Sequence, residues 1–285
     1  MRLVEMKIEV DDGTVLFVRD YRPNVQTLSN SDRFRTMVWI HGLGEHGGRY
    51  LHLTDVFVGR DWRLILIDLR GHGRSTGLRT HVRSFDEYVT DLAQVWDQLN
   101  LNSERVVLGA HSMGGLIALR AVQTDRIRPS AIVLSSVLLG VKLRISPFKR
   151  ILGRLLVKLV PTVRFRNGLD PCNMTRDAEF SRQRRADPLI VRTVTASWFF
   201  SMETAIAQAR RDVHQISIPI LALRGGADVT TDGDVVAHWL MQTASEVTDL
   251  ISLPDHVHGL LHESDWKDTT NRVLTWLEST APSLF

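Results

Sequence analysis

The sequence of 285 residues contains a single cysteine, Cys172. One thiol cannot form a disulfide within the chain, so nothing ties the protein to an oxidising compartment, and we interpret Cys172 as an incidental thiol. Long apolar runs are also missing, because no stretch approaches the roughly 20 residues that a membrane-spanning helix needs. Residues 1–12 mix charges with apolar side chains, which predicts no signal peptide and a cytoplasmic protein.

A large excess of charge of one sign is absent as well. The formal net charge of +3 is too small to indicate nucleic-acid binding, so no nucleic-acid partner is predicted. The sequence has no internal repeat and no low-complexity run. With 44% hydrophobic and 24% charged residues, it has the composition of a globular protein long enough for one large domain with an insertion.

Short apolar runs alternate with helical patterns along most of the chain. Most of the runs are continuously apolar, as strands buried on both faces require. Strands are predicted at residues 6–10, 15–21, 37–40, 64–67, 106–108, 131–134, 220–223 and 250–253, and helices at 85–99, after residue 112, at 234–242 and at 266–277. This order predicts an α/β fold with a mostly parallel eight-stranded sheet between helices, led by an antiparallel hairpin that turns at residues 11–13.

The alternation stops between residues 136 and 215. This stretch reads as helical or irregular, is broken by four prolines, and is too long for a loop in a compact domain. We interpret residues 137–215 as a helical cap inserted between two parts of the core, residues 1–136 and 216–285. The cap is expected over the carboxyl edge of the sheet, where open α/β sheets bind ligands.

Positive charge is concentrated in this expected cap. Between residues 141 and 185 the chain has twelve lysines and arginines but only three acidic residues, and apolar side chains are interspersed among them. Such an amphipathic basic stretch can lie on an anionic membrane surface, or it can cover the core while its charges are solvated. The sequence leaves both interpretations open.

Ser112 stands where a predicted strand becomes a predicted helix. Residues 110–114, Ala-His-Ser-Met-Gly, match the Gly-x-Ser-x-Gly nucleophile elbow, with Ala110 in place of the first glycine. A serine hydroxyl is a poor nucleophile until the backbone presents it and a base takes its proton. The pattern therefore predicts Ser112 as a catalytic nucleophile.

An acid and a base are expected at the ends of later strands, in that order along the chain. Asp228 follows the strand at 220–223 behind three small residues that let it turn inward, so it is favoured as the acid over Asp232 and Asp234, which lie further into the loop. After the last strand come three histidines that could each be the base: His256, His258 and His262. Two of these are four residues apart, a spacing that also occurs in metal sites, but a glycine and the lack of further ligands nearby argue against a metal.

Four segments resemble one branch of a known family. Residues 41–50, His-Gly-Leu-Gly-Glu-His-Gly-Gly-Arg-Tyr, are similar to its His-Gly-x-Gly-Glu-His-x-x-Arg-Tyr signature, and residues 71–75 to its Gly-His-Gly-x-Ser segment. Residues 111–115 resemble its elbow and residues 258–263 its histidine motif. On these segments the chain resembles the monoacylglycerol lipase and lysophospholipase branch of the α/β-hydrolase family, of the serine aminopeptidase S33 type.

The resemblance implies an α/β-hydrolase fold and a triad in which His258 is the base for Ser112 and Asp228 orients it. The oxyanion of the reaction is then expected to be bound by the backbone N–H groups of Leu43 and Met113. His41 and His111 are interpreted as structural. No cofactor and no metal is implied.

The resemblance also implies the substrate class. A serine hydrolase of single-chain lipid esters is expected, foremost of monoacylglycerol, with a lysophospholipase or a short-chain carboxylesterase as alternatives and a non-catalytic ligand-binding protein as another. In the resembled lipases the residues at positions 45 and 49 bind the glycerol head group, but Glu45 and Arg49 could equally form a salt bridge that fixes the loop. Position 261 is a leucine where those lipases have a further histidine, and His262 is one step away.

Overall fold

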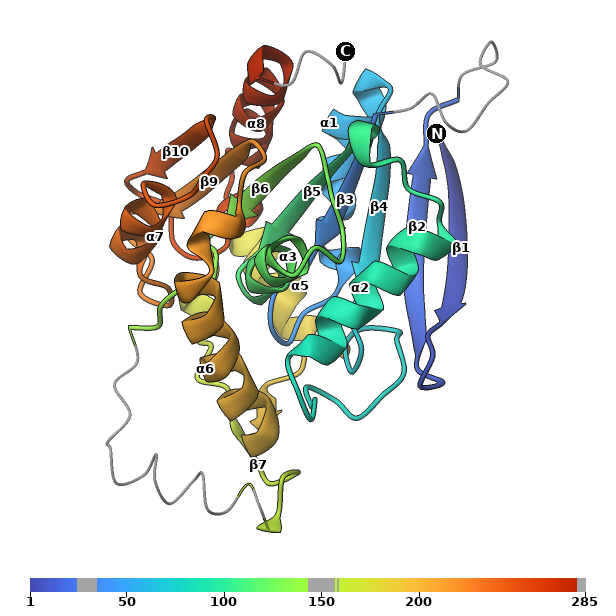
Figure 1. Ribbon diagram of the computed structural model, residues 1–285, viewed down its shortest axis with the longest axis vertical. Helices are drawn as coiled ribbons and strands as arrows, with labels where there is room; N and C mark the ends of the chain where they lie inside the picture. Colours follow the sequence, from blue (N-terminus) through green and yellow to red (C-terminus); the bar gives the residue numbers. More distant parts are fainter. Residues whose placement is uncertain (25–34, 143–156, 158, 281–285) are drawn as a thin grey trace.

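The computed structural model describes residues 1–24, 35–142, 157 and 159–280. Its frame is an eight-stranded sheet in the order β1-β2-β4-β3-β5-β6-β9-β10 (Figure 1). The strands are β1 (Arg2–Glu9), β2 (Val15–Arg22), β3 (Thr36–Ile40), β4 (Arg63–Asp68), β5 (Val106–His111), β6 (Ala131–Ser135), β9 (Ile220–Gly225) and β10 (Thr248–Leu253). β1 and β2 form the expected antiparallel hairpin, β2 pairs antiparallel with β4, and the remaining pairs are parallel, so the predicted sheet is confirmed.

The side chains of alternate residues in the central strands pack into two separate hydrophobic layers, one on each face of the sheet. In β3, Met37 and Trp39 face a cluster that includes side chains of α1 (Thr54–Phe57) and α8 (Trp266–Thr280). Val38 and Ile40 face the opposite cluster, built with α2 (Asp86–Gln98), α3 (Met113–Gln123) and α7 (Gly233–Leu240) (Figure 1). Because both faces are covered, strands in the centre of the sheet are continuously apolar, and each large side chain buried there contributes about 1.5–3 kcal/mol.

The segment between β6 and β9 differs from the expected helical cap in two respects. It contains α5 (Ala178–Ala186), but also a small antiparallel sheet of β7 (Arg164–Arg166) and β8 (Thr193–Thr195). Strands of three residues are too short to show a periodic pattern in the sequence. Its last helix, α6 (Ala196–Arg211), buries Trp198, Met202 and Ala205 in the same cluster as α3, so it belongs to the core layer although it lies within residues 137–215.

Much of the basic stretch, residues 143–156 and 158, lies outside the described residues. In the part of the chain that is described, no helix is both long and apolar enough to cross a membrane.

Candidate active site

The backbone at Ser112 has the sharp turn that the elbow pattern predicts. Ser112 lies between β5 and α3 with φ +51° and ψ −114°, a conformation that non-glycine residues adopt only under strain. A Cβ at Gly114 would lie 2.6 Å from the carbonyl oxygens of Ile40 and His41, so only glycine allows α3 to pass this close to β3. The turn places the serine hydroxyl at the carboxyl edge of the sheet.

Two loops from distant parts of the chain bring a histidine and an aspartate to this hydroxyl. His258 Nε2 lies 3.0 Å from Ser112 Oγ, and His258 Nδ1 lies 2.9 Å from Asp228 Oδ2. All three side chains are buried. The structure thus connects the three residues by hydrogen bonds in the order Ser112, His258, Asp228.

Asp228 is held by its own loop as well as by the histidine. Its Oδ1 accepts from the N–H groups of Thr230 at 2.7 Å and Thr231 at 3.2 Å, and its Oδ2 accepts from the Thr231 hydroxyl at 2.6 Å. Burial alone would raise the pKa of Asp228, but the hydrogen bonds and charge of His258, and the donors of the two threonines, outweigh burial and hold the pKa below its ordinary value. The ionised carboxylate accepts from His258 Nδ1–H, which leaves the Nε2 lone pair facing the hydroxyl.

The rival acids and bases are used elsewhere. Asp232 caps α7 by accepting from the N–H groups at positions 234 and 235, and Asp234 pairs with Arg224 at 2.7 Å. His256 Nε2 lies 2.9 Å from Asp265, and His262 Nε2 lies 3.0 Å from the carbonyl oxygen of Arg49. Among the described residues, no three His, Cys, Asp or Glu side chains are grouped as metal ligands would be.

The loop after β3 passes beside the elbow. A Cβ at Gly42 would lie 3.3 Å from Ser112 Cβ, so the backbone of this loop passes close to the elbow. His41 fixes this loop, because its Nε2 accepts from Leu69 N–H at 3.0 Å and its Nδ1 donates to the Gly42 carbonyl at 2.8 Å. Met113 begins α3, where N–H groups have no acceptor within the helix. An oxyanion site formed by the N–H groups of Leu43 and Met113 remains a proposal.

Glu45 and Arg49 are both buried next to this site, at 5% and 8% exposure. Glu45 Oε1 accepts from Gly42 N–H at 2.8 Å and from the Tyr50 hydroxyl at 2.7 Å. The ion pair of Glu45 in the described structure is with Arg184 of α5, at 3.7 Å, and not with Arg49 as the sequence allowed. Sequence reasoning did not single out Arg184 or Thr231, since nothing local marks either residue.

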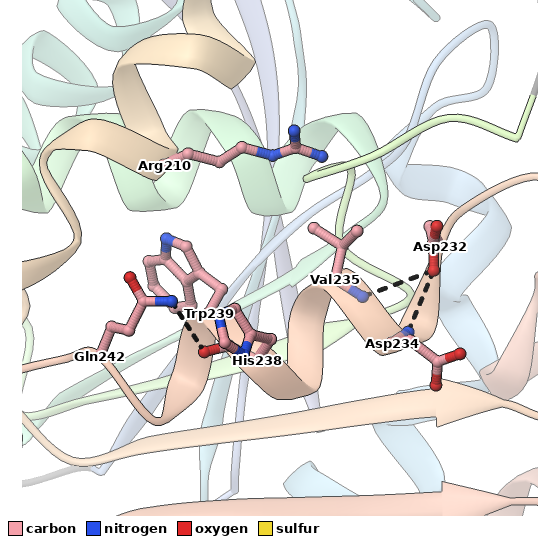
Figure 2. A pocket seen from close by; sticks show the side chains of 7 residues that line it. All are labelled: Arg210, Asp232, Asp234, Val235, His238, Trp239 and Gln242. Carbon is pink, nitrogen blue, oxygen red and sulfur yellow. Dashed lines mark hydrogen bonds between the residues drawn. The ribbon is translucent and has the colours of Figure 1, made fainter.

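A hollow of about 490 Å³ lies between α6 and α7, away from Ser112, His258 and Asp228 (Figure 2). Its polar groups serve the fold: Arg210 Nε donates to the carbonyl of Leu139 at 2.6 Å, and Asp232 caps α7. None of Ser112, Asp228 and His258 lines it. The size of a hollow therefore does not locate the chemistry in this protein.

Comparison with known proteins identifies the family of this chain. Residues 32–265 match the model of a hydrolase family described as serine aminopeptidase, S33. The chain belongs to this family. It is 28% identical over 234 residues to phospholipase YtpA of Bacillus subtilis, covering 81% of this chain and 90% of that one. It is 27% identical over 267 residues to human monoglyceride lipase, covering 92% and 85%.

The fold has close counterparts among solved structures. A monoacylglycerol lipase of Paleococcus ferrophilus superposes with a TM-score of 0.80 at 24% identity, covering 98% of this chain and 99% of that one. The chain thus has the α/β-hydrolase fold, as its sequence motifs indicated.

Several buried histidines are expected to make this α/β-hydrolase sensitive to acid. Burial lowers the pKa of His52 and His111 to about 4 and that of His72 to about 3. In the unfolded chain these histidines have a pKa near 6.5, so below that pH the unfolded chain binds protons while the buried native histidines stay neutral. The free energy of unfolding therefore decreases as the pH falls.

For His72 alone, the free energy of unfolding is expected to fall by about 2 kcal/mol between pH 7 and pH 5. The variant His72→Asn, whose amide can replace the Nδ1–H donor to the Arg70 carbonyl, should lose less stability over this interval than the wild type. Urea unfolding of both proteins at pH 7 and pH 5 measures this loss of stability. Because each protein is compared with itself at the two pH values, any destabilisation by the substitution itself cancels. Equal intervals for the two proteins would show that His72 does not contribute.

Proposed function

We propose that the protein hydrolyses carboxylic esters of single-chain lipids, foremost monoacylglycerol to glycerol and fatty acid, through an acyl-enzyme on Ser112. The observation that carries the proposal is the hydrogen-bonded series of Ser112, His258 and Asp228, with distances of 3.0 and 2.9 Å. Each proton needed for ester cleavage has a donor or acceptor in this series.

In the first half of the reaction, Ser112 Oγ attacks the ester carbonyl while His258 Nε2 takes its proton. The tetrahedral oxyanion accepts hydrogen bonds from the N–H groups of Leu43 and Met113. His258 then gives the proton to the departing glycerol oxygen. In the second half, His258 activates a water that attacks the acyl-enzyme, and the fatty acid is released. Asp228 stays ionised throughout and stabilises the imidazolium.

The surroundings of the triad support an alcohol with hydroxyl groups as the leaving group. Glu45, Arg49 and His262 line a polar hollow that also includes His111, the neighbour of the nucleophile. Burial holds the pKa of His262 well below its ordinary value, so the ring is neutral. Its Nε2–H donates to the Arg49 carbonyl, which leaves Nδ1 as an acceptor for a hydroxyl. The human relative is a monoglyceride lipase and the B. subtilis relative a phospholipase, and both agree with a lipid ester as the substrate.

Side-by-side hydrolysis of 1-monoolein, lysophosphatidylcholine and p-nitrophenyl acetate tests the substrate class. We expect at least about tenfold higher kcat/KM on the long-chain esters than on the acetate, because burial of each acyl CH₂ adds binding energy. Faster hydrolysis of the acetate would indicate a short-chain carboxylesterase. No turnover of any ester by folded protein, with no labelling by a fluorophosphonate, would indicate a non-catalytic binding protein.

We also propose that the protein contacts anionic membrane surfaces through residues 159–166. Leu159, Val160, Val163 and Phe165 are exposed there, at 79%, 45%, 42% and 40%, beside the exposed Arg166. Apolar side chains flanked by arginines favour an anionic lipid surface.

Co-sedimentation with vesicles containing phosphatidylglycerol should exceed that with phosphatidylcholine alone, and Arg166→Glu should reduce it. Arg128→Glu is the matched control, because the exposed Arg128 precedes β6 and so lies at the amino edge of the sheet. Equal binding of both vesicle types, or equal losses in both variants, would contradict this surface.

A further inference from the structure

One oxygen of the Asp228 carboxylate accepts hydrogen bonds from two side chains. Asp228 Oδ2 lies 2.9 Å from His258 Nδ1, and it also accepts from the Thr231 hydroxyl at 2.6 Å. The contact is buried, since 4% of Asp228 and 3% of Thr231 is exposed. An ionised carboxylate only accepts hydrogen bonds, so the threonine is the donor. The Thr231 hydroxyl therefore bonds the same atom that faces the proposed base.

The backbone around Thr231 is held from outside its own loop. Thr231 forms an isolated antiparallel bridge with Val141, in the chain that leaves β6. The residues on either side of Thr231 are held by the same chain, through backbone hydrogen bonds of 3.1 Å to residue 140 and 3.4 Å to residue 142. The ammonium group of Lys142 donates to the Asp228 carbonyl at 2.6 Å. Residues 140–142 thus fix the position from which the Thr231 hydroxyl reaches the carboxylate.

The other titratable groups around His258 come from three parts of the fold. The ring centroid of His111 in the elbow lies 4.7 Å from that of His258, and burial lowers the pKa of His111 to about 4, so this ring is neutral. Glu45, in the loop after β3, interacts electrostatically with His111. Lys142 lies at the carbonyl of Asp228 and not at its carboxylate. Among the described residues, Asp228 is thus the charged group hydrogen-bonded to the His258 imidazole, and a change at Oδ2 acts on that ring directly.

We propose that Thr231 is a positioning residue of this hydrolase, whose hydroxyl fixes the orienting oxygen of Asp228 and limits how strongly the carboxylate stabilises the protonated form of His258. The proposal rests on the ester hydrolysis proposed at Ser112 and changes none of its steps, because Thr231 neither gives nor takes a proton. Thr231 is not among the residues that line the hollow beside the elbow, so its effect on the reaction passes through Asp228 and His258.

The hydroxyl has two separable effects. It stabilises the negative charge on Oδ2, so the carboxylate attracts the imidazolium less and His258 remains an unprotonated base to lower pH. It also prevents rotation of the carboxylate about its last bond. The N–H groups of Thr230 and Thr231 hold Oδ1, and the hydroxyl holds Oδ2 toward His258 Nδ1. The first effect sets the pH range of activity, and the second sets the rate within that range.

Thr231→Val tests both effects, because valine removes the hydroxyl and keeps the branched shape and the backbone N–H. On the soluble ester 1-hexanoylglycerol, kcat at the pH plateau should fall about 5- to 50-fold, with KM changed by less than about twofold. The acid-side midpoint of the kcat/KM profile should move to higher pH by at least about 0.5 unit. Thr231→Ser, which restores the donor, should return both quantities close to wild type. Thr230→Val is the matched control, because Thr230 bonds Asp228 through its backbone N–H, which valine keeps.

The profiles are measured from pH 5.5 to 8.5, with near-UV circular dichroism as the check on folding. A folded Thr231→Val variant with the wild-type profile would overturn the proposal, and so would a loss of kcat with an unmoved midpoint, which indicates a purely structural role. No recovery in Thr231→Ser, or an equal effect of Thr230→Val, would also contradict it. If Thr231→Val does not fold, Thr231→Ala is judged by the same criteria. Absence of turnover by the folded wild type would instead reject the ester hydrolysis itself, and this proposal with it.

Discussion

Ser112→Ala is expected to lower ester turnover by at least about 10³-fold while the protein stays folded. The alanine keeps the Cβ of the elbow and removes only the oxygen that would form the acyl-enzyme. The Ser112 hydroxyl is the one hydrogen-bonded to His258, so without it a residual rate would come from water and the oxyanion donors.

Steady-state hydrolysis of 1-monoolein and labelling by a fluorophosphonate probe measure this effect, and thermal unfolding monitors the fold. Ser201→Ala is a suitable control, because the Ser201 hydroxyl donates within α6, to the Trp198 carbonyl at 2.9 Å. Labelling of the Ser112→Ala variant, or turnover within about tenfold of the wild type, would remove Ser112 from the mechanism.

Asp228→Asn is expected to lower kcat about 10⁴-fold, with little change in the fold. The backbone N–H groups of Thr230 and Thr231 donate to Oδ1, so they hold the amide oxygen of the asparagine at that position. The amide NH₂ would then face His258 Nδ1 and donate to it. The imidazole would carry its proton on Nε2, toward Ser112, and could not act as a base.

Asp232→Asn separates this effect from a general effect of the loop. Asparagine caps helices about as well as aspartate, so this variant should keep nearly full activity and stability. Determining kcat for both variants decides between the two aspartates. Equal activities, or a larger loss at position 232, would show that the orienting acid is misassigned.

The strands of the core could be predicted because their sequence patterns are local. β3 and β5 are buried on both faces, so their residues form short apolar runs, and an apolar run followed by small residues around a serine predicts the elbow. The same reasoning could not predict β7 and β8, because strands of three residues each are too short to show a periodic pattern of hydrophobic residues. It also could not assign α6 to the core, since this depends on α3 packing against it from some eighty residues earlier in the chain.

For the site, the sequence by itself was enough to propose the nucleophile, the two loops that carry the proposed acid and base, and the segment beside the elbow that contains Glu45. Local spacing specifies these features, because a turn and its neighbours are close in the chain. The sequence favoured Asp228 over Asp232 as the acid, but only the tertiary structure brought the Asp228 carboxylate within hydrogen-bond distance of His258 and made Arg184 from α5 the cation beside Glu45. Which side chains meet depends on how separate loops pack over the sheet edge. The distance between residues on two such loops cannot be read from any short stretch of sequence.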